Sequence, residues 1–294
     1  MDPLKKKFEN INEKGSKHPN CFIVAEIGQA HEGSLGIAHS YIDAVSETGV
    51  DAIKFQTHIA DSESSVDDKF RLDIFPQDKN RYEYWKRMEF SEEQWIGLAK
   101  HAEEKGIEFL SSPFSEKAIE ILLKMNIKAW KIGSGEFFNE YIIDKLIKTN
   151  LPLIVSTGMS LTAEIDKLVE KFTSKSVDFA LLQCTSKYPM SYKEVGLNLM
   201  HQFREKYKCL TGLSDHTGTI FPSLAALAQG SDFLEVHTTF DKRMFGPDSS
   251  SSIEIQDLKF ICDARNAFNE ILNNPLDKDK KSYELLETKK LFTK

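Results

Sequence analysis

The sequence is poor in cysteine, has no excess of positive charge and contains no long apolar run. Its four cysteines, among 294 residues, are scattered without a pair at the spacing of a metal-binding knuckle, so we expect reduced thiols and a cytoplasmic location. The formal net charge of -7 opposes the basic surface that nucleic-acid binding needs. No segment approaches membrane-spanning length, and the charged residues 1–18 lack the apolar stretch of a signal peptide. We therefore expect a protein that binds neither nucleic acid nor a membrane.

Eight short apolar runs alternate with helical patterns along the chain. Ser34, Ser91 and Ser115 each precede a helical pattern and are suited to cap it. Eight strand–helix units predict an α/β fold, a (β/α)8 TIM barrel, although the same pattern also permits an open doubly wound sheet. We assign residues 1–274 to the barrel and 275–294 to a charged tail or linker. The predicted strands are Phe22–Ile27, Ala52–Gln56, Ile107–Ser111, Ala129–Gly133, Pro152–Ser156, Phe179–Cys184, Leu210–Ser214 and Phe233–His237.

Polar and ionisable residues gather where these runs end. In a barrel the carboxyl ends of all the strands face one bowl, which is where the active sites of this fold lie. The residues that we expect around this bowl are Glu26, Lys54, Gln56, Ser111, Ser112, Lys131, Ser134, Glu136, Ser156, Thr157, Gln183, Thr185, Ser186, Tyr188, Ser214, Asp215, His216 and His237.

Lys54 and Lys131 fall inside two predicted strands, where a charged side chain would be buried. A buried ammonium group is costly unless an anion pairs with it. A salt bridge to Glu26 or Glu136 would satisfy each lysine. An anionic ligand would explain both lysines together with the hydroxyl-rich loops, and we favour this interpretation.

His216 and His237 end the last two predicted strands. Imidazole is a common metal ligand, and two imidazoles at neighbouring strand ends could hold a divalent metal with positions left for substrate. A hydrogen-bonded structural role is the alternative for each histidine. Asp215 could orient a ligand histidine or cap the following turn. Glu235 shares a strand face with His237, and we assign it no role.

Residues 58–90 are too many for an ordinary connection between a strand and a helix, and they are rich in aromatic and charged side chains. Long connections on the active face of a barrel are often lids. A surface insertion packed by its own aromatic side chains is the alternative.

Short blocks of residues carry a family resemblance. They are Ala25–Gly28, Gly33–Leu35, Lys54–Thr57, Ser111–Ser115, Trp130–Glu136, Ser156–Ser160, Gln183–Pro189, Gly212–Thr217, Glu235–His237 and Phe245–Asp248. These blocks resemble the sialic acid synthase family and occur in the family's order. The resemblance implies a (β/α)8 barrel that condenses phosphoenolpyruvate with an N-acetylated hexosamine, N-acetylmannosamine or a relative, to a nine-carbon 2-keto sugar acid with release of phosphate. It also implies a divalent metal, Mn²⁺ or alternatively Mg²⁺, and a homodimer.

The resemblance also implies roles for single residues. The metal ligands would be His216 and His237, and the catalytic residues Glu136, Glu26 and Lys131. The residues around phosphoenolpyruvate would be Lys54, Ser112, Lys131, Ser134, Ser156, Ser186 and Ser214. The residues that contact the sugar would be Glu26, Gln56, Phe114, Tyr188 and Asp248.

The chain departs from the family pattern at several places. Ala30–Gly33 reads Ala-His-Glu-Gly where the family often has Asn-His-Asn-Gly, and the serine run Ser249–Ser252 follows Asp248, which leaves the acceptor sugar open. Ser186 stands where asparagine is common. The family usually continues into a small antifreeze-like domain that supplies an arginine to the sugar, whereas this chain stops near the linker. We therefore expect either a truncated chain or a sugar pocket that is closed in another way.

Three alternatives remain open from the sequence. The acceptor could be a diacetamido-deoxyhexose of the legionaminic or pseudaminic type. It could be a sugar phosphate, which would require a second cluster of arginine or lysine side chains. The chain could also be a non-catalytic sugar-binding barrel, although both histidines, both lysines and Glu136 speak against that.

Overall fold

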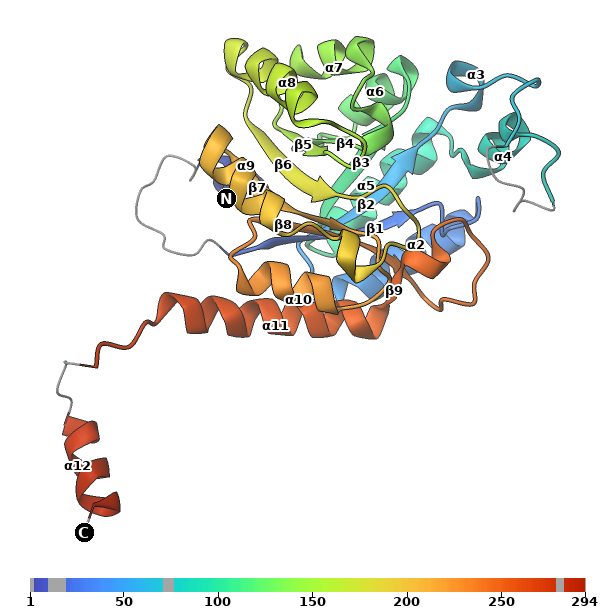
Figure 1. The fold of residues 1–294 in the computed structure, drawn as a ribbon. Coiled ribbons are helices and arrows are strands. Elements are labelled where there is room, and N and C mark those ends of the chain that lie inside the picture. Colours follow the sequence, from blue (N-terminus) through green and yellow to red (C-terminus); the bar gives the residue numbers. More distant parts are fainter. Residues whose placement is uncertain (1–2, 10–19, 71–76, 279–282, 294) are drawn as a thin grey trace.

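Eight parallel strands form the centre of the molecule (Figure 1). The computed structural model describes residues 3–9, 20–70, 77–278 and 283–293. Hydrogen bonds join the strands in the order β3-β2-β1-β8-β7-β6-β5-β4, and the end strands β3 and β4 lie side by side. This nearly closed ring confirms the predicted (β/α)8 TIM barrel and excludes the open sheet. The strands are β1 (Phe22–Gly28), β2 (Ala52–Thr57), β3 (Glu108–Pro113), β4 (Trp130–Ile132), β5 (Leu153–Ser156), β6 (Phe179–Cys184), β7 (Leu210–Asp215) and β8 (Phe233–Thr239), with a short β9 (Ile253–Glu254) beside β8.

Helices cover the outside of the ring. Ser34, Ser91 and Ser115 cap α2, α5 and α6 as predicted, because each hydroxyl accepts a hydrogen bond from a backbone N–H of the first turn. The α-helices are α1 (Pro3–Glu9), α2 (Leu35–Ser46), α3 (Ala60–Glu63), α4 (Arg81–Met88), α5 (Glu92–Glu104), α6 (Glu116–Leu123), α7 (Glu140–Ile147), α8 (Thr162–Ser174), α9 (Asn198–Tyr207), α10 (Phe221–Ala228), α11 (Ile255–Asn273) and α12 (Tyr283–Phe292). Short 3-10 turns are η2 (Ser134–Glu136), η3 (Tyr192–Glu194) and η4 (Ser249–Ser251).

The amino-terminal helix α1 closes one end of the barrel. Its Leu4 and Phe8 are buried in the cluster that fills the barrel interior. The Phe8 and Phe22 rings lie 5.7 and 5.6 Å from the ring of Phe233. Burying one such side chain contributes about 2 kcal/mol. Because this end is filled with apolar side chains, a polar site is left to the opposite end, where the strands terminate.

Strand register brings distant polar residues to one level of the barrel. Glu26 on β1 lies beside Lys54 on β2 and beside His237 on β8. Ser214 on β7 lies beside Glu235 on β8. The polar residues that the sequence spreads over most of the chain therefore meet within a few ångströms.

The carboxy-terminal helix lies away from the barrel. In the predicted tail 275–294, Tyr283–Phe292 forms α12, which Figure 1 shows beyond α11 and away from the barrel. Among the residues that the structure describes, no helix combines the length and the apolar character needed to cross a membrane.

Candidate active site

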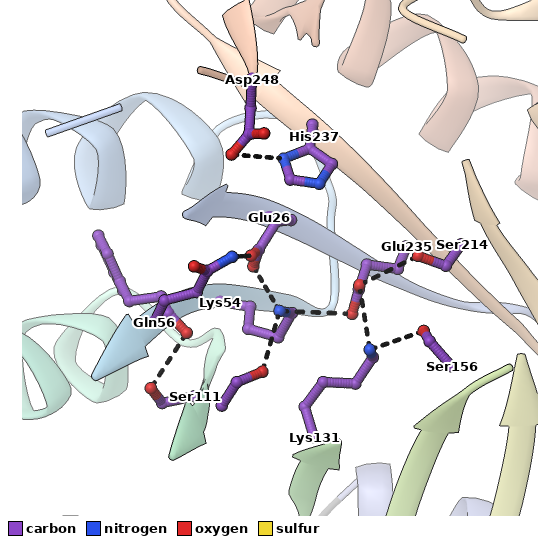
Figure 2. Close-up of polar contacts among 12 residues, drawn as sticks. Glu26, Lys54, Gln56, Ser111, Lys131, Ser156, Ser214, Glu235, His237 and Asp248 are labelled. Atoms are coloured by element: carbon purple, nitrogen blue, oxygen red, sulfur yellow. Dashed lines mark hydrogen bonds and ion pairs between the residues drawn. The ribbon is translucent and has the colours of Figure 1, made fainter. Parts of the chain in front are cut away.

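Two buried lysines meet on one buried carboxylate at the floor of the bowl (Figure 2). Glu235 places Oε1 3.4 Å from Lys131 Nζ and Oε2 3.8 Å from Lys54 Nζ. Lys54 Nζ also lies 2.7 Å from Glu26 Oε2. All four side chains are at least 94% buried. The predicted pairing of Lys54 with Glu26 is present, whereas Lys131 pairs with Glu235 rather than with Glu136.

Burial and neighbouring charges have opposite effects on the pKa values of these groups. Burial alone would raise the pKa of Glu235, but the ammonium groups of Lys131 and Lys54 outweigh it and hold the pKa at about 2. Burial lowers the pKa of Lys131 despite Glu235. For Lys54 the two carboxylates of Glu235 and Glu26 overcome burial, and its pKa is raised. Lys131 is thus the cation of this cluster that most needs a further anion.

Hydroxyl groups surround the two lysines. Lys131 Nζ donates to Ser156 Oγ at 2.8 Å, and Lys54 Nζ to Ser112 Oγ at 3.4 Å. Ser214 Oγ donates to Glu235 Oε1 at 3.3 Å. These three serines therefore lie where the sequence predicts them, around the lysines.

Ser134 and Ser186 both approach Gly158. A Cβ at Gly158 would lie 2.4 Å from Ser186 Oγ and 2.6 Å from Ser134 Oγ, so only glycine fits there. The Gly158 N–H donates to Ser134 Oγ at 3.0 Å. Ser186 Oγ is buried and has no hydrogen-bond partner among the described residues, which is the state expected of a hydroxyl that serves a ligand.

The rings of His216 and His237 lie close together at the same end of the barrel as the lysines. The ring centres of His216 and His237 lie 5.3 Å apart at 60°. Two imidazoles on one metal place their ring centres about 4.5–5.5 Å apart, given a metal–nitrogen distance of about 2.1 Å. Burial lowers the pKa of both histidines, which favours the neutral form that binds metals.

The donor atoms also fit a metal. His216 Nδ1 lies 2.9 Å from the Thr185 carbonyl oxygen, so it carries the proton and Nε2 is the nitrogen with the lone pair that a metal would use. His237 Nδ1 is buried 3.8 Å from Asp248 Oδ2, and no residue in the described ranges forms a hydrogen bond with it. Within the described part of the chain, no group of three or more His, Cys, Asp or Glu side chains could hold a metal. A metal held by His216 and His237 would have two protein ligands and would take its others from substrate and water.

Three of the predicted sugar-binding residues converge around Gly28. A Cβ at Gly28 would lie 3.4 Å from Asp248 Oδ2 and 3.5 Å from both Gln56 Nε2 and Glu26 Oε1. Gln56 Nε2 donates to Glu26 Oε1 at 2.9 Å. Gly28 itself has φ +54, a conformation that glycine adopts without strain. The arrangement provides two carboxylates and one amide that could bind sugar hydroxyls.

The other two predicted sugar-binding residues lie to either side of this cluster. Tyr188 stacks on His216 with ring centres 4.2 Å apart, and its hydroxyl lies 3.2 Å from His216 Nε2. Phe114 stacks on His58 at 4.1 Å. Tyr188 therefore occupies the nitrogen that a metal would use and would have to turn aside when one binds.

Glu136 lies apart from the lysines. It follows β4 on η2, is half-buried and accepts a hydrogen bond from Asn139 Nδ2 at 2.7 Å. Burial raises its pKa, and its charged neighbours are Glu63, His58 and Arg81. The structure thus groups Glu136 with the residues that follow β2, and its catalytic role stays a prediction.

Two residues near the site had no role in the sequence interpretation. The sequence assigns no role to Glu235, although strand alternation places it on the face of His237. It identifies His58 only as the first residue of a long connection. Asp215 accepts hydrogen bonds from the Thr217 N–H at 2.9 Å and from Ser223 Oγ at 3.3 Å. It therefore caps the turn that follows β7, which is the second of its two predicted roles.

Comparison with known proteins places the chain in a family. A model of the NeuB family matches residues 41–276. The N,N'-diacetyllegionaminic acid synthase of Legionella pneumophila is 36% identical over 263 residues, which cover 86% of this chain and 73% of that protein. Human N-acetylneuraminate-9-phosphate synthase is 32% identical over 270 residues, covering 89% and 73%.

A solved structure agrees with these relatives. The crystal structure of N-acetylneuraminic acid synthetase from Leptospira borgpetersenii, in complex with citrate, superposes with a TM-score of 0.79 at 27% identity and covers 94% of this chain and 93% of that one. The barrel, the order of its sequence blocks and these similarities lead to one conclusion: the chain belongs to the NeuB family.

Proposed function

We propose that this protein condenses phosphoenolpyruvate with an N-acetylated hexosamine to a nine-carbon 2-keto sugar acid and releases phosphate. The observation that carries the proposal is the meeting of Lys54 and Lys131 on Glu235 below two histidine rings 5.3 Å apart. The relatives support it, because they are named as synthases of legionaminic acid and of N-acetylneuraminate 9-phosphate.

Phosphoenolpyruvate has a phosphate and a carboxylate, one for each lysine. Lys131 with Ser156 and Lys54 with Ser112 supply the donors, and Ser134 and Ser186 add two further hydroxyl groups. The two lysines and the two glutamates at the floor, Glu26 and Glu235, sum to zero charge. An anion that binds there needs further positive charge, and a divalent metal at His216 and His237 would supply it.

The chemistry forms one C–C bond and one C–O bond to water, and it breaks the C–O bond to phosphate; the new hydroxyl loses its proton as phosphate leaves, which gives the 2-keto group. The methylene carbon of phosphoenolpyruvate attacks the aldehyde carbon of the open-chain sugar, whose oxygen takes a proton. Water adds to the central carbon, and phosphate leaves with the electron pair of the C–O bond. A bound divalent metal, Mn²⁺ or alternatively Mg²⁺, supplies Lewis acidity. Glu136, whose pKa burial raises, is our candidate to accept the proton of the water or to donate one to the sugar oxygen.

The mouth of the bowl favours an acceptor sugar without a phosphate. Glu26 and Asp248 converge where the sugar is expected. Three of the described cations around the rim are already paired with carboxylates. These pairs are Arg87 with Glu32 and Asp78, Lys187 with Glu194, and Arg243 with Asp241. N-acetylmannosamine or a diacetamido-deoxyhexose therefore suits the site better than a sugar phosphate.

Release of phosphate tests the proposal. The protein is incubated with Mn²⁺, phosphoenolpyruvate and each of a panel of N-acetylhexosamines and diacetamido sugars, with Lys131→Met in parallel. We expect phosphate release with at least one sugar, and a KM for phosphoenolpyruvate that Lys131→Met raises far more than the KM for the sugar. Binding of both ligands without any phosphate release would instead favour the non-catalytic barrel.

A further inference from the structure

His58 is a buried titratable residue beside the sugar-binding cluster that the proposed reaction leaves unused. It follows the last residue of β2 and is 3% exposed. Its ring lies between Trp85 of α4, with ring centres 3.6 Å apart at 12°, and Phe114, at 4.1 Å and 16°. Stacking on both faces holds the plane of the ring, so the directions of its two nitrogens are set.

Both ring nitrogens of His58 face hydrogen-bond acceptors. Nδ1 lies 2.9 Å from Glu63 Oε2, and Nε2 lies 3.3 Å from Gln56 Oε1. The Gln56 amide has two further partners, because its Nε2 donates to Glu26 Oε1 at 2.9 Å and its Oε1 also accepts from Gln29 Nε2 at 3.3 Å. A neutral imidazole has one N–H and can donate to only one acceptor, whereas an imidazolium donates to both.

We propose that His58 is a positioning residue, an imidazolium held by Glu63 that fixes the side-chain amide of Gln56 for the acceptor sugar. The contacts form one chain, Glu63–His58–Gln56–Glu26, and it reaches Lys54 through the 2.7 Å pair of Glu26. The packing of α3 and α4 outside the barrel thereby sets the orientation of an amide inside the bowl. The identity of the ligand as a sugar rests on the proposed function.

Charged groups from several elements lie around His58. Glu63 on α3 and Glu136 on η2 are the carboxylates in range. His31 is the other histidine close to His58. Burial lowers the pKa of His31 to about 3, so His31 is neutral and does not repel a charge on His58. The guanidinium of Arg81 lies on the far side, 6.0 Å from the centre of the Trp85 ring.

Nuclear magnetic resonance of ¹⁵N-histidine-labelled protein tests the protonation directly, without substrate. The His58 signals are assigned by their loss in His58→Phe, which keeps an aromatic ring between Trp85 and Phe114. At pH 7 we expect both nitrogens of His58 to carry protons, and one of them to lose its proton in Glu63→Gln. The signature of a neutral tautomer in the unaltered protein would overturn the proposal.

Kinetics test the positioning role. Losing one hydrogen bond to a charged group should raise the KM for the sugar about tenfold in His58→Phe, with the KM for phosphoenolpyruvate and kcat within about twofold. Glu63→Gln alone should raise the KM for the sugar. Combined with His58→Phe, it should add nothing to the effect of His58→Phe. Asp67→Asn makes the same charge change at an exposed residue of the same connection and is the control.

Each kinetic outcome decides a different question. Equal increases in both KM values, or additive effects of the two substitutions, would show that His58 acts only through stability and would overturn the positioning role. If the unaltered protein releases no phosphate with any sugar, the proposed function fails, whereas the resonance experiment still decides the state of His58.

Discussion

At the scale of single residues, the floor of the bowl concentrates buried charge in a few mutually dependent side chains. Glu235 contacts both Lys131 and Lys54. Removing one partner of a buried ion pair leaves the other charge buried and costs about 3–5 kcal/mol, whereas replacing the pair by apolar groups costs far less. The stability of the floor therefore depends on pairs rather than on individual residues.

Glu235→Gln should lower the free energy of unfolding by about 3 kcal/mol, because two ammonium groups then share one carboxylate. The double variant Glu235→Gln/Lys131→Met should lose clearly less than the sum of the two single variants. Urea unfolding at pH 7 measures all three. Asp144→Asn, which breaks the exposed pair with Lys171, is the control and should change stability by less than about 1 kcal/mol. Additive losses would show that the buried cluster does not act as a unit.

The histidine pair supports a second prediction at this scale. His216→Ala or His237→Ala should weaken Mn²⁺ binding by at least about tenfold, since each removes one of two protein donors, and should abolish phosphate release. Calorimetric titration with Mn²⁺ and circular dichroism separate loss of metal from loss of fold. His201→Ala, on the exposed face of α9, should bind Mn²⁺ like the unaltered protein. Full activity of either site variant would remove the assignment of these residues as metal ligands.

At the scale of elements, the loop after β1 contacts the connection after β2 at the rim of the bowl. Arg87 on α4 contacts Glu32 at 2.8 Å and Asp78 at 2.8 Å. A Cβ at Gly33 would lie 2.0 Å from the carbonyl oxygen of Arg87, so the two backbones touch. His31 is fully buried and its ring lies 4.8 Å from that of Phe90. The described part of 58–90 is thus packed by its aromatic side chains, while residues 71–76 lie outside the described structure.

His31 makes this packing sensitive to acid. Burial, with smaller effects of His58 and Arg87, lowers its pKa from 6.5 to about 3. Below pH 6.5 His31 binds a proton in the unfolded chain but not in the folded protein. The contribution of His31 to the free energy of unfolding is therefore complete above pH 6.5. It is lost as the pH falls from 6.5 towards 3, by up to about 1.4 kcal/mol per pH unit.

Urea unfolding between pH 7.5 and 4.5 measures this loss. The unaltered protein should lose more stability over this range than His31→Asn, which keeps an acceptor for the Gly33 N–H but does not titrate. His201→Asn, at an exposed site, should follow the unaltered protein. Parallel curves for His31→Asn and the unaltered protein would contradict the assignment of a buried neutral His31.

At the scale of the whole molecule, net charge and the acidic groups of the bowl act together. The formal net charge is -7, and Glu136 and Asp248 add negative charge near the acceptor site. Such a field disfavours a second phosphate and weakens as salt rises.

A comparison of two acceptors tests this field. At low ionic strength, kcat/KM should be at least about tenfold higher for N-acetylmannosamine than for its 6-phosphate, and the ratio should shrink in 0.5 M salt because salt screens exposed charges within about 5 Å. Phosphate release measures both substrates. A preference for the sugar phosphate would show that the bowl holds a second anion site, and would assign the chain the substrate class suggested by the name of its human relative.

Much of this architecture was predictable from the sequence. Apolar runs of strand length between capped helical patterns predict the barrel, and the position of a residue at a strand end predicts that it faces the bowl. Lys54, Lys131, Ser156 and the two histidines meet for that reason. Helix ends such as those set by Ser34 and Ser115 depend on hydrogen bonds within one turn, and they too were predicted.

Only the tertiary structure decided which of these residues touch. Glu235 pairs with Lys131, Glu136 belongs with Glu63 and His58, and Tyr188 covers His216, because each of these contacts depends on side-chain reach across a closed ring of strands. Local pattern determines which way a residue points from its own element. The partner that it finds depends on how the barrel closes and on how α3 and α4 pack outside it, and no spacing along the chain encodes those distances.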